Sequence, residues 1–212
     1  GCPDGRLGTH HHPGSAHQYR SRETCAVSEK KLTGRVVATM YGSTTVAAPV
    51  ETVWDQIINV DIHSFAHPRY FSWLGIPNPL RAEVMNSGVG GQRIAYFDTG
   101  KRFIQRITVW RPPLEYAFSF NPEKGFKVAY LFDLSDGIVQ IPTGSYLLTE
   151  TSGGTAGTTI RLGTEYSIDQ RFELVLRVPV KLALRGFQRF LLTAISKNSL
   201  DAARTSSTTR GA

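Results

Sequence analysis

The chain has 212 residues, of which 41% are hydrophobic, and this is enough for one domain with a sizeable core. The sequence has no run of 18 or more apolar residues, which excludes a membrane-spanning helix. The formal net charge is +7, and most of the excess lies in residues 177–212, which hold seven basic side chains and one acidic side chain. This distribution favours solubility, or contact with a membrane surface or an acidic partner, over nucleic-acid binding.

Residues 1–34 are rich in glycine, serine, histidine and arginine and show no period, so we expect an irregular or disordered N-terminal tail. The only two cysteines, Cys2 and Cys25, lie in this tail and have no metal-ligand spacing. The origin of the histidine-containing tail and any processing of the N-terminus are left open. We expect the protein to be cytoplasmic or peripheral to a membrane.

The first predicted elements are a strand, a helix and an irregular segment. Residues 35–46 are rich in valine and threonine, which is typical of a strand. Pro49 suits the first position of a short amphipathic helix, in which apolar residues recur at helical spacing through Ile58. Residues 61–79 hold many aromatic side chains and three prolines without a clean period. This segment therefore predicts a turn or short helix that packs irregularly.

After Pro79, short apolar runs alternate with turn signals, which predicts consecutive antiparallel strands. The predicted strands are 81–86, 92–97, 102–110, 114–120, 126–134, 145–151 and 158–168. Alternate residues give each strand one apolar face, as with Tyr116 and Phe118, or Leu162 and Tyr166. We therefore expect a single sheet that is covered on one side.

The final helix is predicted to begin at Pro179 and to span about 20–25 residues, which is long enough to cross a sheet. Its apolar face consists of Val180, Leu184, Phe187, Leu191 and Ile195. Its opposite face carries a basic row that consists of Lys181, Arg185 and Arg189. We expect the apolar face to cover the sheet and the basic row to contact a membrane or an acidic protein peripherally. Residues 205–212 are predicted to be a polar tail.

The order of these pieces resembles the START/Bet v 1-like superfamily, also called SRPBCC or the polyketide cyclase/dehydrase and lipid transport family. The matching segments are 46–54 (VAAPVETVW), the glycine-led hairpin 88–100, the W-x-P-P strand–turn–strand 107–118, and the last two strands within 144–166. The resemblance implies an α+β helix-grip fold. In this fold a curved antiparallel sheet of six to seven strands wraps around a long C-terminal helix, with a short helical segment after the first strand. The expected START/Bet v 1-like domain spans residues 35–204.

The superfamily includes lipid carriers, hormone receptors, cyclases and dehydratases, so the fold does not select one chemistry. The resemblance implies binding of a small hydrophobic or aromatic ligand, such as a lipid, a polyketide-like compound or an isoprenoid, between the sheet and the helix. The alternatives are a cofactor-independent polyketide aromatase/cyclase or dehydratase, and a non-catalytic scaffold or partner-binding subunit. Gln105 stands where members with the W-x-P-P turn commonly have an acid, and this departure weakens the enzymatic alternative.

The candidate ligand-binding residues are His67, Tyr70, Trp73, Arg93, Tyr96, Gln105, Tyr116, Phe118, Tyr146, Tyr166, Phe187 and Leu191. If the chain is an enzyme, the first candidates for moving protons are His67, Glu83, Tyr146 and Tyr166. A one-residue change of register swaps the two faces of a strand, so whether Arg93 or Tyr96 points inward stays open. We expect no cofactor, and no metal either, because Pro68 follows His67 and no third ligand lies near His63 and His67.

Overall fold

The computed structural model describes residues 27–32, 34–63, 65–73, 75–128, 132–134, 137–151 and 157–209. The predictions for residues 1–26, including the two cysteines and the histidine cluster, lie outside the described residues. The sheet consists of β1 (Val27–Leu32), β2 (Arg35–Val46), β3 (Pro79–Asn86), β4 (Gln92–Phe97), β5 (Arg102–Arg111), β6 (Glu115–Pro122), β9 (Val139–Glu150) and β10 (Thr158–Asp169). All neighbouring strands are antiparallel, in the order β1-β2-β10-β9-β6-β5-β4-β3.

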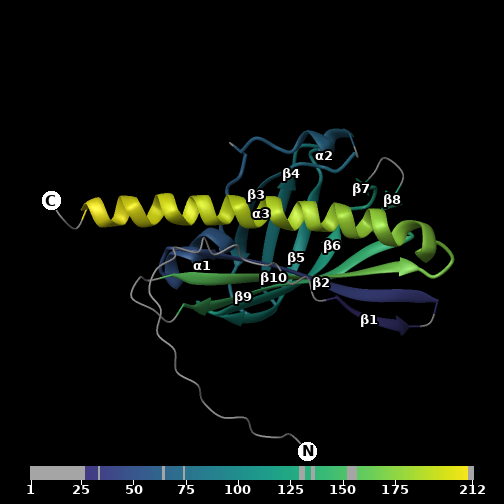
Figure 1. Cartoon of the computed structure of the whole chain (residues 1–212), viewed down its shortest axis with the longest axis horizontal. Coiled ribbons are helices and arrows are strands. Elements are labelled where there is room, and N and C mark those ends of the chain that lie inside the picture. The colour runs from purple at the N-terminus through teal and green to yellow at the C-terminus, as the bar shows by residue number, and fades with distance from the viewer. Residues whose placement is uncertain are drawn as a thin grey trace, which may run out of the picture.

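Three helices accompany the sheet within the described part of the chain: α1 (Val50–Ile58), α2 (Arg69–Trp73) and α3 (Glu173–Thr209). α3 runs along the whole length of the molecule and packs on β2, β10 and α1 (Figure 1). α1 begins directly after Pro49, and its valine, tryptophan and isoleucine side chains are all buried. The predicted helix-grip fold is therefore confirmed. Seven of the strands lie where strands were expected, although β9 begins at Val139, six residues before its predicted start, and β1 is added at the edge.

Several local predictions are wrong, and the first concerns the N-terminal tail. Residues 27–32 were expected to be irregular, but they form β1, whose pairing with β2 runs from Val27 opposite Met40 to Leu32 opposite Arg35. The single strand predicted over 126–134 is instead a small separate ribbon of β7 (Lys127–Val128) and β8 (Phe132–Asp133). Phe126 and Leu134, which flank this ribbon, are buried and joined by a backbone hydrogen bond of 3.0 Å.

The predicted bounds of the last helix are also wrong. α3 has 37 residues, begins six residues before Pro179 and continues to Thr209, into the segment expected to be a polar tail. A proline inside a helix leaves the carbonyl four residues earlier without its usual N–H donor. Here that carbonyl belongs to Val175, which is exposed, so water can hydrogen-bond it and the helix continues.

The predicted apolar faces are confirmed. On α3, Leu184 and Ile195 are buried, while Val180, Phe187 and Leu191 are partly buried and pack against the core. On β10, Leu162 and Tyr166 are buried as expected, and so are Ile160, Thr164 and Ile168 on the same face. None of the helices in the described part of the chain is long and apolar enough to span a membrane.

Candidate functional site: a cavity between the sheet and α3

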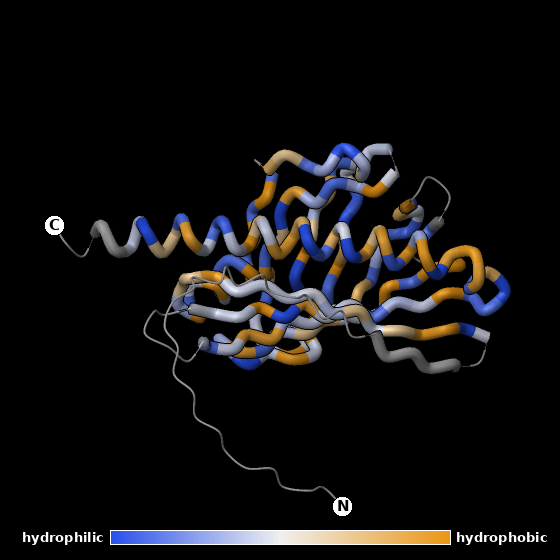
Figure 2. Tube along the Cα trace, in the orientation of Figure 1, coloured by the Kyte–Doolittle hydropathy of each residue, from blue (hydrophilic) through white to orange (hydrophobic). Residues whose placement is uncertain are grey.

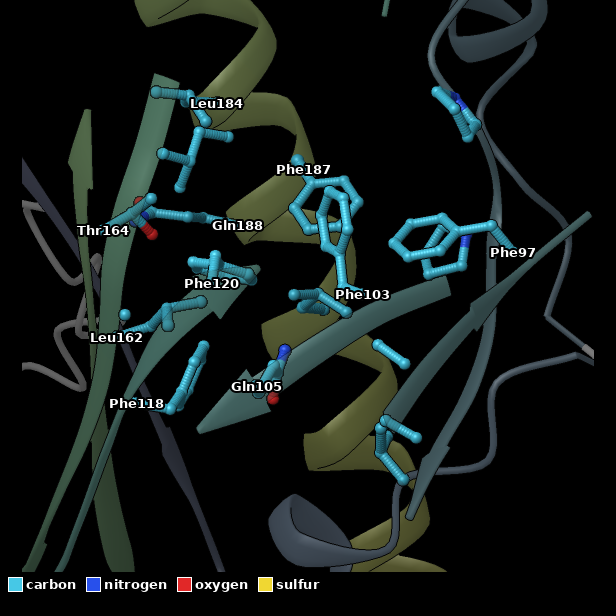
Figure 3. Close-up of a pocket in the computed structure, with 18 of the residues that line it drawn as sticks. Phe97, Phe103, Gln105, Phe118, Phe120, Leu162, Thr164, Leu184, Phe187 and Gln188 are labelled. Atoms are coloured by element: carbon cyan, nitrogen blue, oxygen red, sulfur yellow. The ribbon is translucent and has the colours of Figure 1, made fainter. Parts of the chain in front are cut away.

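A cavity of about 140 Å³ lies between α3 and the inward face of the sheet. Its walls are mainly aromatic, with phenylalanines contributed by β4, β5, β6, the loop before β7, and α3: Phe97, Phe103, Phe118, Phe120, Phe126 and Phe187. Figure 3 shows Leu162 and the rings of Phe97, Phe103, Phe118, Phe120 and Phe187 around one space, with α3 behind them. The cavity is thus the apolar interior that the alternating pattern of the strands predicts.

The phenylalanine rings of the cavity wall pack against one another. Phe103 lies at the centre, with ring centroids 5.0 Å from Phe97, 5.4 Å from Phe120 and 4.1 Å from Phe126. The contacts with Phe97 and Phe120 are edge-to-face, a geometry that aromatic pairs prefer. This cluster gives the cavity a rigid wall on the β4–β5 side.

One end of the cavity is polar because Arg93 points inward from β4 and is buried. Its Nε donates to the carbonyl oxygen of Ile58 at 3.0 Å, and one terminal nitrogen donates to that of Ile57 at 2.7 Å. The other terminal nitrogen donates to Oε1 of Gln105 at 2.9 Å. α1 ends at Ile58, so its C-terminal carbonyls and the negative end of its dipole face the guanidinium. Arg93 forms no ion pair with the described residues, and its charge is offset by neutral acceptors.

Tyr116 lies directly behind this polar end. Its hydroxyl is 3.5 Å from Oε1 of Gln105, and its ring lies 5.9 Å from the Arg93 guanidinium carbon. Burial raises the pKa of Tyr116 to about 12, although the positive charge of Arg93 opposes the shift. Burial likewise raises the pKa of Tyr146. Both phenols therefore stay protonated near neutral pH, where they can donate a hydrogen bond but cannot serve as bases.

The raised pKa of Tyr116 predicts a specific loss of stability in alkaline solution. The unfolded tyrosine titrates near pH 10, so ionisation above that pH favours the unfolded chain until the folded pKa near 12 is passed. Between pH 8 and pH 11 this residue should cost about 1.4 kcal/mol of unfolding free energy. Urea unfolding of the wild type and of Tyr116→Phe at both pH values measures the difference, and the variant should lose less stability by that amount. Equal losses in the two proteins would contradict the assignment.

A second polar pair lies on the opposite wall, where α3 meets β10. The side-chain amide of Gln188 donates to the Thr164 hydroxyl at 2.8 Å and to the Met40 carbonyl at 3.2 Å. Gly42 makes room for it, because a Cβ at that position would lie 3.0 Å from the Gln188 side-chain oxygen. Figure 3 shows Gln188 reaching across to Thr164. This pair fixes α3 on the sheet and gives the cavity a second polar point.

The cavity is lined by six of the predicted ligand-binding residues: Arg93, Gln105, Phe118, Tyr146, Phe187 and Leu191. The remaining predicted residues are not among its lining: His67, Tyr70, Trp73, Tyr96, Tyr116 and Tyr166. Trp73 is 79% exposed, since α2 turns Phe71 inward instead. The structure also decides which side chain of β4 points inward. Arg93 faces the cavity, whereas Tyr96, three residues later, points to the other face of the sheet. There its hydroxyl donates to Glu83 at 2.9 Å.

The predicted proton-moving residues are not brought together. Nε2 of His67 lies 3.0 Å from the Pro79 carbonyl oxygen, and its ring packs near Phe190. Glu83 is engaged by Tyr96 and by Arg81, away from the cavity. Tyr166 is buried in β10 but does not line the cavity, which leaves Tyr146 alone in it. Among the described residues, no three histidine, cysteine, aspartate or glutamate side chains gather as a metal site would require.

Sequence reasoning missed several residues of the cavity. Phe103 is two positions before Gln105 on β5, so the period-two pattern that selected Gln105 indicates it as well. Gln188 lies four residues after Leu184 and four before Leu192, on the buried face of α3, but a search for apolar side chains passes over it. Phe126 carries no such signal, because its inward position depends on the β7–β8 ribbon.

No family model and no curated protein matches the chain. The solved structure of Ara h 8.0201 aligns with a TM-score of 0.51 and 16% identity, over 78% of this chain and 99% of that one. A protein from Nitrosospira multiformis aligns at 0.49 and 18%, covering 78% and 99%. Norcoclaurine synthase from Thalictrum flavum, in complex with dopamine and hydroxybenzaldehyde, aligns at 0.47 and 17%, covering 79% and 89%. At these identities, the likeness to Ara h 8.0201 shows a shared fold, that of the Bet v 1-like proteins.

Proposed function

We propose that this chain, as a protein with the Bet v 1-like helix-grip fold, binds one small apolar or aromatic ligand in the cavity, with an oxygen-bearing group directed at Arg93. The observation that carries the proposal is an aromatic-walled cavity with one buried guanidinium that forms no ion pair with the described residues. An apolar pocket with a few converging polar groups is the usual form of a small-molecule site. The apolar walls supply affinity, and Arg93 and Gln105 supply orientation.

The size of the cavity supports a compact ligand. An apolar protein cavity of about 150 Å³ admits a molecule such as benzene. The cavity of about 140 Å³ is of that size and is partly open, so it suits one ring, two rings of which the second lies toward the opening, or a short isoprenoid. A diacyl lipid or a long polyketide chain requires the walls to move apart, so within the predicted ligand classes the compact ones are favoured.

Arg93 supports a ligand with a carboxylate or another oxygen acceptor. Its hydrogen bonds to Ile57, Ile58 and Gln105 use three of the five N–H groups of a guanidinium, which leaves donors for a bound molecule. Charged hydrogen bonds are stronger than neutral ones, and burial excludes competing water. A ligand anion in this place also balances a positive charge whose acceptors, among the described residues, are all neutral.

Catalysis by an aromatase/cyclase or dehydratase is the second candidate. The observation that favours it is the same polar end, because Arg93 and Gln105 could stabilise negative charge that develops on a substrate oxygen. Proton transfer at neutral pH also needs a base with a suitable pKa. The titratable groups of the described cavity lining are arginines and Tyr146, whose pKa is raised, so binding is the better supported function.

Titration with a matched pair of compounds tests the proposal. 2-Naphthoate and 2-methylnaphthalene share their rings, but only the first carries a carboxylate. We expect both to bind at neutral pH, as followed by the fluorescence of the naphthalene ring, and the carboxylate to bind about tenfold tighter or more. The proposal is contradicted if neither compound binds and no other member of a panel of one- and two-ring compounds binds.

The predicted contact of Lys181, Arg185 and Arg189 with a membrane or an acidic protein remains a proposal, as does a peripheral location. Arg185 and Arg189 are exposed, and Lys181 is half-buried. The scaffold alternative depends on this same face of α3. The exposed apolar residues beside this basic face of α3 bear on whether its partner is a membrane or a protein.

A further inference from the structure

The N-terminal end of α3 exposes a cluster of large apolar side chains that the core does not use. We name this cluster the α3 tip, and it consists of Phe172, Leu174, Val175, Val178 and Leu182. Leu174 is 88% exposed, Val175 75%, Val178 62% and Leu182 61%. Figure 2 shows a hydrophobic stretch at this end of the helix, and Figure 1 places it at the opposite end of α3 from the C-terminus. Contiguous exposed apolar groups of this kind mark interaction surfaces.

Basic side chains lie on the same face of the helix as the α3 tip. Leu174, Val178 and Leu182 follow one another at four-residue steps, and Arg185 continues the same face three residues later. Residues 171–189 hold five basic side chains and one acidic side chain. Arg171 forms an ion pair with Asp169, and Arg177 forms one with Glu173. The surface therefore combines exposed apolar side chains with a net positive charge.

We propose that the α3 tip docks on the surface of an anionic lipid bilayer, where its apolar side chains enter the interface and Lys181 and Arg185 meet lipid headgroups. This combination of apolar and basic side chains is what interfacial helices use. Charge complementarity selects the bilayer over a second copy of the chain. In a two-fold dimer the same patch meets itself, so the two sets of basic side chains would repel each other.

The α3 tip is also continuous with the cavity along the helix. Leu182 directly precedes Ala183 and Leu184, which line the cavity, and Phe187 follows one turn later. Docking at the tip therefore holds the helical wall of the cavity close to the bilayer. The proposal goes beyond ligand binding in the cavity, and it stands on surface residues that do not line that cavity.

Flotation of the full chain with lipid vesicles tests the proposal. We expect binding to vesicles of phosphatidylcholine with phosphatidylserine, and binding about tenfold weaker to phosphatidylcholine alone. Leu174→Ser/Val178→Ser should weaken binding to the anionic vesicles by about tenfold or more. The matched control is Met85→Ser/Val89→Ser, which changes two exposed apolar residues on the β3–β4 hairpin and should bind as the wild type does.

A second pair of variants separates charge from apolar insertion. Lys181→Gln/Arg185→Gln should lower binding to anionic vesicles by about tenfold, and higher salt should produce the same loss. Lys124→Gln/Lys127→Gln, at exposed positions near β7, is the matched control. The proposal is overturned if the wild type does not float with anionic vesicles, or if Leu174→Ser/Val178→Ser binds them as tightly as the wild type does. A concentration-dependent dimer that this variant abolishes would overturn it too, since the occupant would then be a second copy.

Discussion

Ala95→Phe should lower the affinity for 2-naphthoate by about 100-fold while the protein stays folded. Ala95 is buried on β4 between Arg93 and Phe97, and it lines the cavity. A phenylalanine ring at this position enters the space of about 140 Å³ that the ligand would fill. Because the ring occupies existing space, the free energy of unfolding should change by less than the roughly 1–3 kcal/mol that overpacking usually costs.

The matched control for Ala95→Phe is Ala117→Phe. Ala117 lies on β6 between Tyr116 and Phe118, whose side chains point inward, so its own side chain points to the other face of the sheet. The control adds the same ring without entering the cavity, and its affinity for 2-naphthoate should match that of the wild type. Unchanged binding by Ala95→Phe, with a normal urea unfolding curve, would place the ligand site outside the cavity.

Arg93→Met should have two effects that are measured separately. The first is a decrease of about 3 kcal/mol in the free energy of unfolding, because the carbonyls of Ile57 and Ile58 and the Gln105 oxygen lose their donor in a buried place. The second is loss of the preference for the carboxylate, so that 2-naphthoate binds no better than 2-methylnaphthalene. Urea unfolding measures the first effect, and ligand fluorescence measures the second.

Arg106→Met is the control for Arg93→Met, since Arg106 is an exposed arginine on the neighbouring strand β5. Its unfolding free energy should stay within about 0.5 kcal/mol of the wild type, with both affinities unchanged. If Arg93→Met keeps the preference for 2-naphthoate, the buried guanidinium does not orient the ligand. If it keeps wild-type stability, the hydrogen bonds to the end of α1 contribute little to the fold.

The fold was predictable because its elements carry strong local signals. The predicted bounds of β2 and β4 match the structure, since alternation and turn residues define both strands. The start of α3 was missed because Pro179 was interpreted as the first helical residue. Because of that interpretation, residues 172–178 were assigned to a loop, and no helical face was predicted for them. The exposed apolar side chains that they contribute to the α3 tip were therefore not predicted.

The candidate site was only half predictable, because inward-facing positions depend on register and on irregular segments. Arg93 and Tyr96 could not be told apart until the end of α1 was placed, since its carbonyls are what Arg93 binds. In the segment 61–79, the aromatic composition indicated packing but not direction. Phe71 is the ring that packs under α3 beside Phe187, whereas Tyr70 and Trp73 are exposed.

Native mass spectrometry of the full chain tests the central claim most directly. The wild type and Ala95→Phe are each exposed to the same mixture of one- and two-ring carboxylates, their neutral analogues and short isoprenoid acids. We predict that the wild type retains one ligand per chain, preferentially an acid, and that Ala95→Phe retains none. Equal retention by the two proteins, or no retained mass on the wild type, would contradict the account of this cavity as a ligand site.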